Sequence, residues 1–117
     1  MLDNARIENC ANKAAYIAHK VLGLDCSYSI ALINDPTLTV DGQLDTQENV
    51  IQINLATLKP FPPDSMVGQD EEMSEEDLRI DEDYRHILKV CVVVFHEMRH
   101  LYQKMAHIRS TRNWAAG

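Results

Sequence analysis

Several features that define special structural classes are scarce in this sequence. It has only three cysteines, an odd number without paired spacing, which argues against a disulfide-stabilised secreted scaffold. Its longest apolar run, residues 90–95, is too short to span a bilayer, and the N-terminus lacks the basic and apolar segments of a secretory leader. We therefore expect a cytoplasmic protein with no membrane segment.

Positive charge is also scarce, with 11 lysines and arginines against 18 acidic residues and a formal net charge of -7. A protein that binds nucleic acid needs a basic face, so we expect no nucleic-acid partner. The acidity is local, because residues 70–83 contain nine acidic residues and one arginine. We interpret this segment as a long solvated loop. Two sharper alternatives are a lid over a cleft and a source of a carboxylate metal ligand.

Apolar periodicity predicts the order of secondary structure. Residues 3–22 have helical spacing, with Asp3 as a capping residue and Gly23 as a helix stop. Strands are predicted at residues 26–33, 37–40 and 49–55, separated by turn residues. A proline-rich loop and the acidic segment follow, and a second helix is predicted from about residue 83 to about residue 109. The 117 residues fit one domain of the α+β class, with a mostly antiparallel three-stranded sheet.

The most informative residues are His96-Glu97-Met98-Arg99-His100, an H-E-x-x-H pattern on the predicted second helix. Residues four apart on a helix lie about 40° apart around the axis and about 6 Å apart along it, so two imidazoles can converge on one Zn²⁺ ion. Glu97 lies about 100° round from His96, beside such an ion, where a general base for a metal-bound water would act.

The rest of this helix supports a functional interpretation of the histidines. Its apolar residues gather on one stripe that we expect to face the core, directly opposite the histidines. This stripe consists of Ile87, Cys91, Val94, Met98, Leu101, Tyr102 and Met105. Of the other histidines, His86 has no motif around it and is expected at the surface.

The sequence resembles the minimal zincins of the minigluzincin kind, small metallopeptidase domains found in bacterial phage and mobile-element proteins. The segment HEMRHLYQ, the apolar run before it, the strand NVIQINL at residues 49–55 and the order of elements carry this resemblance over most of the chain. It implies a zincin-like fold, Zn²⁺ bound by His96 and His100, and Glu97 as general base. It also implies that residues 49–55 form the sheet edge along which a peptide or protein substrate lies.

The sequence departs from this family at the third zinc ligand, commonly a glutamate on a later helix. No acidic residue follows Glu97, and His107 lies about 10.5 Å beyond His100 along an unbroken helix. We expect the third ligand either in the acidic segment or beyond Gly117, because the tail at residues 112–117 does not resemble a natural domain end.

Three functions remain open at this point. The first is a zinc-dependent peptidase in which Glu97 activates water. The second is a non-catalytic zincin-fold module for binding or regulation, which the missing third ligand favours. The third is an interaction module without metal, whose acidic segment contacts a basic partner. The substrate and the oligomeric state do not follow from the sequence.

Overall fold

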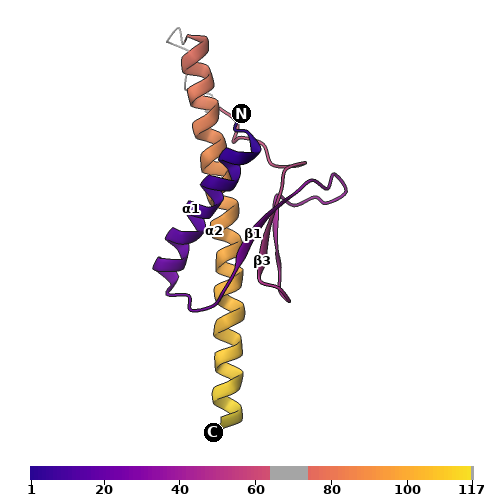
Figure 1. The fold of residues 1–117 in the computed structure, drawn as a ribbon, viewed down its shortest axis with the longest axis vertical. Helices are drawn as coiled ribbons and strands as arrows, with labels where there is room; N and C mark the ends of the chain where they lie inside the picture. Colours follow the sequence, from indigo (N-terminus) through magenta and orange to yellow (C-terminus); the bar gives the residue numbers. More distant parts are fainter. Residues whose placement is uncertain (64–73, 117) are drawn as a thin grey trace.

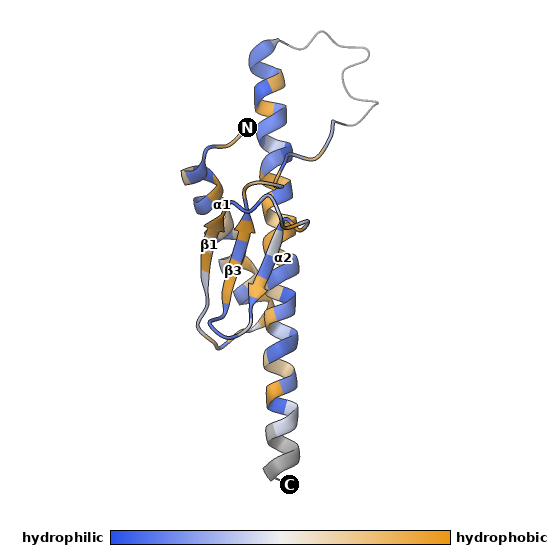
Figure 2. Cartoon of the chain, turned by 90° about the vertical axis from the view of Figure 1, so that its right-hand side faces the viewer, coloured by the Kyte–Doolittle hydropathy of each residue, from blue (hydrophilic) through white to orange (hydrophobic). Residues whose placement is uncertain are grey.

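The computed structural model describes residues 1–63 and 74–116, with side chains up to residue 111. Its elements are α1 (Asn4–Leu22), β1 (Ser29–Ile33), β2 (Gly42–Asp45), β3 (Val50–Asn54) and α2 (Glu75–Ala116). Both helices lie on one face of the sheet, α1 against β1 and α2 against β2 and β3 (Figure 1 and Figure 2). The α+β class and the order of elements agree with the sequence prediction. Neither helix, over its described length, has an apolar stretch that could cross a membrane.

Both ends of α1 are formed by the residues that the sequence indicated. The Asp3 carboxylate accepts a hydrogen bond from the backbone N–H of Arg6 at 2.8 Å, as a helix N-cap does. At the other end Gly23 adopts a left-handed conformation with φ of 65°, and its N–H bonds to the carbonyl of His19. The buried side of α1 consists mainly of alanines, which let this helix approach α2 closely.

The sheet is mixed, and the prediction of a mostly antiparallel sheet is wrong. The strand order is β1-β3-β2, with β3 parallel to β1 and antiparallel to β2. β3 is central because Ile51 and Ile53 are fully buried against the helices, whereas β2 has a polar sequence suited to a sheet edge. Residues 49–55 therefore do not form the sheet edge that the resemblance implied.

The second strand was predicted at residues 37–40 and is instead β2, five residues later. Buried Asn54 accounts for part of this difference. Its side-chain amide donates hydrogen bonds to the carbonyls of Asp35 and Val40, at 3.0 and 3.2 Å, and its oxygen accepts bonds from the N–H groups of Asp35 and Ala56. The predicted strand thus lies in a connection held by one asparagine, and Gly42 begins a strand where we had expected a turn.

The helix α2 starts earlier than predicted and includes most of the acidic segment. Ser74 caps it, since its hydroxyl accepts a hydrogen bond from the N–H of Asp77 at 3.1 Å. The acidic side chains at residues 75–77 lie in the first helical turn, where they interact favourably with the helix dipole. The loop interpretation is therefore wrong for residues 75–83, while residues 70–73 lie outside the described part of the chain.

The buried face of α2 is rotated from its predicted position. The α2 side chains that are buried in the hydrophobic core are Val90, Val93, Val94, Met98 and Leu101. Val93 lies only about 60° round the helix from His96, and the predicted core residues Ile87 and Tyr102 are 38% exposed. The buried face is not directly opposite the histidines because α2 packs against α1 on one side and against the sheet on another.

His86 is also buried, at 2% exposure, although we had expected it at the surface. Its Nδ1 atom accepts a hydrogen bond from the backbone N–H of Leu2 at 3.0 Å. Burial lowers the pKa of His86 below its ordinary value, because the charged imidazolium loses hydration there. This histidine therefore favours its neutral form in the folded protein.

Candidate metal site

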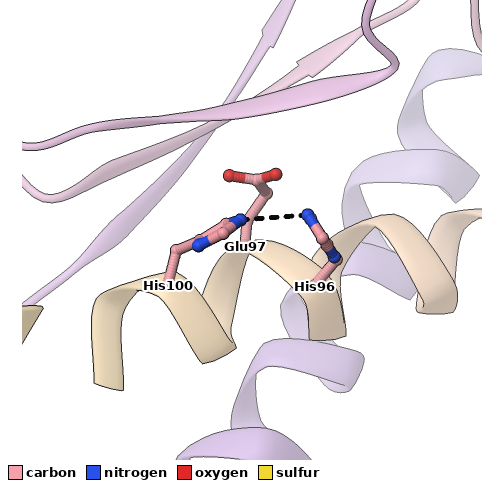
Figure 3. Close-up of side chains that lie close together, drawn as sticks. All are labelled: His96, Glu97 and His100. Atoms are coloured by element: carbon pink, nitrogen blue, oxygen red, sulfur yellow. Dashed lines mark hydrogen bonds between the residues drawn. The ribbon is translucent and has the colours of Figure 1, made fainter. Parts of the chain in front are cut away.

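The two histidines of the motif come together on one side of α2. Their four-residue spacing places the Nε2 atoms of His96 and His100 2.9 Å apart, with the rings nearly perpendicular (Figure 3). Both side chains are exposed at the wall of a cavity. One ring donates a hydrogen bond to the other in this arrangement, so the two nitrogen atoms converge on the same small volume.

Glu97 differs from the histidines in its environment, since it is only 6% exposed. Its side chain extends from the helix toward the strands and places the carboxylate between the two imidazoles (Figure 3). The potential ligand atoms of Glu97 and the two histidines all lie within 4.8 Å of one another. Among the described side chains, no lysine or arginine pairs with this carboxylate.

Close contact between α2 and β2 fixes the position of Glu97 relative to the sheet. Gly42 lies where the helix crosses the strand, and a Cβ atom at this position would be 2.5 Å from Cγ1 of Val93 and 3.5 Å from Cγ of Glu97. Only a residue without a side chain permits this approach. Sequence reasoning missed this role of Gly42 because Asp41-Gly42 is also a common turn pair.

A cavity of about 810 Å³ lies over this contact. Its walls are β2 with the residues just before it, and the α2 side chains from Lys89 to His100. β2 is an edge strand, so one of its sides has no neighbouring strand within the described sheet. The cavity thus brings together an edge strand, two imidazoles and a buried carboxylate.

Charged side chains border the cavity away from the histidines. Lys89 forms an ion pair with Asp41 at 3.2 Å, and its ammonium group lies 4.7 Å from the ring centre of Phe61. This pair joins α2 to the residue that precedes β2. Asp41 is thereby paired with a cation, and it is not part of the cluster that could hold a metal ion.

A second link between α2 and the sheet was also missed from the sequence. The Lys104 ammonium group donates hydrogen bonds to the carbonyl of Thr46 and to Oδ1 of Asn49, the latter at 2.6 Å. Asn49 has a positive φ of 54° in the turn between β2 and β3, a conformation that asparagine tolerates. Lys104 therefore ties the end of the edge strand to the helix that carries the histidines.

Among the described residues, only Glu97 lies close enough to His96 and His100 to act as a third metal ligand. The carboxylates at residues 75–83 precede His96 on the same helix by at least 13 positions, or about 20 Å along the axis. The acidic segment can therefore contribute a ligand only from residues 70–72, which lie outside the described residues. His107 is on the same unbroken helix and projects beyond the site, as its sequence position predicted.

Comparison of the chain with protein-family models, curated proteins and solved structures finds no match. Inference about function therefore rests on the geometry of the cluster formed by His96, Glu97 and His100.

Proposed function

We propose that this protein is a zinc-dependent peptidase of the zincin kind, with His96 and His100 as zinc ligands and Glu97 as general base. The observation that carries the proposal is the juxtaposition of two converging imidazole nitrogens and a buried carboxylate in a cavity beside an edge strand.

The donor set suits a borderline ion such as zinc. Neutral imidazoles bind Zn²⁺ at about 2.0–2.1 Å, and two nitrogens 2.9 Å apart can share such an ion with a ligand–metal–ligand angle of about 90°. A small opening of the two rings toward about 3.3 Å gives the tetrahedral angle of typical zinc sites. Both rings border an open cavity, which leaves room for water and substrate.

In this proposal Glu97 is the group that accepts the proton of the attacking water. A bound zinc ion supplies Lewis-acid polarisation and lowers the pKa of a coordinated water. The Glu97 carboxylate lies within 4.8 Å of both imidazole nitrogens, so a water between these groups is within its hydrogen-bonding reach. Its low exposure excludes bulk solvent and strengthens its interaction with such a proton donor.

The substrate in this proposal is an extended peptide that lies along β2. An edge strand offers unpaired backbone N–H and C=O groups to which a peptide can add as a further strand. β2 lines the histidine cavity from Gly42 to Leu44, so a peptide bound there passes in front of the cluster. In this proposal β2 is the sheet edge along which the substrate lies, a role that the resemblance had given to residues 49–55.

The metal part of the proposal is tested by zinc binding. We expect one zinc ion per chain in the wild type, measured by elemental analysis and by competition with a chromogenic chelator, and loss of that zinc in His96→Ala/His100→Ala. His107→Ala is the matched control, because it removes a histidine of the same helix outside the cluster. Equal zinc content in the double variant and the wild type would refute the site.

The catalytic part is tested with Glu97→Gln, which keeps the side-chain shape and removes the base. We expect this variant to retain zinc and to lose chelator-sensitive hydrolysis of a peptide library almost entirely. Hydrolysis that survives the substitution would exclude Glu97 as the base.

A second candidate function is a non-catalytic zincin-fold module that binds a peptide or protein without cleaving it. It is favoured by the absence of a third ligand, other than Glu97, from the described part of the chain. Two histidines alone hold zinc loosely, and misplacement of reacting groups by about 1 Å can lower a rate about 100-fold. Zinc binding without measurable peptide hydrolysis in the wild type would favour this candidate over the peptidase.

A further inference from the structure

The helix α2 carries a second apolar stripe on the side away from the core. Tyr84, Leu88, Val92, Phe95 and Tyr102 follow one another at spacings of three, four or seven residues and lie within about 80° around the helix. Their exposed fractions range from 38% to 59%. A helix that only covers a core presents polar residues on its outer face, whereas here the fold leaves more than a third of each of these apolar side chains uncovered.

The helix α1 extends this surface. Ile17 and Val21 are 54% and 80% exposed, and together with Phe95 and Tyr102 they line a groove of about 560 Å³ between the two helices. A contiguous apolar area with a groove is typical of an interaction surface, whereas isolated exposed apolar residues are common everywhere. The outer side of the helix pair therefore fits an apolar partner.

The charges along α2 indicate what that partner is. Near the start of α2, Asp77 lies on the same side as the stripe, and near its end Arg99 and Arg109 lie on that side. Lys104 is bound to the turn at Asn49 and takes no part. The helix is therefore acidic toward its start and basic toward its end. A second copy in antiparallel orientation places acidic on basic at both ends, and a parallel copy places like charges together.

Two pairs of residues on this side of α2 are related about a single point. Pairs of positions that add up to 186 share a midpoint at residue 93, and they match Tyr84 with Tyr102 and Asp77 with Arg109. Val92 and Phe95 lie on either side of the same midpoint. About a two-fold axis at this midpoint, Tyr84 meets the partner's Tyr102 and Asp77 meets the partner's Arg109, so both contacts form twice. The stripe extends about 27 Å from the first tyrosine to the last, enough for a paired helix segment.

We propose that two copies of this chain associate through the outer stripe of α2, antiparallel and with a two-fold axis near residue 93. Leu88, Val92 and Phe95 form the centre of the interface, and the ends are joined by Asp77 of one protomer and Arg109 of the other. This association does not require a bound metal ion and goes beyond the proposed peptidase activity. Val92 also lines the histidine cavity, so the second protomer borders that cavity.

The dimer is tested by sedimentation and light scattering over a wide range of protein concentration. We expect a species of twice the 13.3 kDa chain mass that dissociates on dilution. Leu88→Glu and Phe95→Glu each replace an exposed side chain, and we expect each to weaken association at least tenfold while circular dichroism stays unchanged. Tyr16→Glu is the matched control, because Tyr16 is 60% exposed but lines neither the groove nor the stripe; it should dimerise as the wild type does.

Charge reversal tests the orientation. Asp77→Arg and Arg109→Asp each place like charges at both ends of an antiparallel dimer, so each should weaken it, and the double variant should restore it. In a parallel dimer the same residues face their own copies, and none of the three variants changes the affinity. A monomer at every concentration, an undiminished dimer in Leu88→Glu and Phe95→Glu, or insensitivity to the charge reversals would each overturn the proposal.

Discussion

Replacing Gly42 with alanine probes the contact that positions the candidate site. The new Cβ atom would be 2.5 Å from Cγ1 of Val93 and 3.3 Å from the carbonyl oxygen of Gln52. Ordinary contact begins near 3.4 Å, so the strand and the helix must separate by about 0.9 Å. Val93 cannot turn away freely, because a β-branched side chain in a helix has one strongly preferred rotamer. Overpacking of this kind costs about 1–3 kcal/mol.

We expect urea unfolding of Gly42→Ala to give a free energy of unfolding about 1–3 kcal/mol below that of the wild type. Zinc affinity should stay near the wild-type value, because both histidines belong to one helix and move together. Peptide hydrolysis should fall by about 100-fold, because a shift of about 1 Å separates the edge strand from the histidines. Gly23→Ala is the control, because no atom lies within 4 Å of its new Cβ and α2 need not move. Its φ of 65° is unfavourable for alanine, so this variant should also lose about 1–2 kcal/mol of stability. If Gly42→Ala unfolds at the wild-type urea concentration, the close contact does not exist in solution.

Three further predictions concern the groups that support the sheet and the helix pair. Asn54→Ala removes four buried hydrogen bonds and should lower the free energy of unfolding by about 2–4 kcal/mol in urea titrations. Lys104→Met should speed hydrogen exchange at the turn between β2 and β3, because that turn loses its link to α2; unchanged exchange would contradict the link. Because the pKa of His86 is lowered in the folded state, the unfolded chain takes up the proton first as pH falls below about 6.5, and stability decreases there. His86→Gln should flatten this part of the stability–pH curve, and a curve of unchanged slope would contradict the assignment.

Both ends of α1 and the cluster on α2 were predictable because they depend on neighbours in the sequence. Asp3 and Gly23 cap α1 through groups three to four residues away. The convergence of His96 and His100 follows from the helical repeat alone.

The sheet was less predictable, because its order depends on contacts between distant residues. Residues 37–40 have the β-branched composition of a strand but lie in a connection held by Asn54, whereas β2 forms from a mostly polar sequence. Strand propensity is weak compared with burial and pairing, so composition misplaced this strand. The parallel pairing of β1 with β3 likewise joins strands that are not consecutive in the sequence, so local composition does not reveal it.

The position of Glu97 connects the fold to the proposed chemistry. Around the helix, residue 97 lies about 100° from His96 and about 60° from His100. A helix that exposes both histidines therefore directs residue 97 to one side of them, and here that side faces the sheet and is buried. A carboxylate at 6% exposure without a basic partner among the described side chains is unfavourable for folding, because burial removes its hydration. An apolar residue would pack there at lower cost. A cation held by the two imidazoles, whose nitrogen atoms lie within 4.8 Å of the carboxylate, would compensate this charge, as the proposed metal site requires.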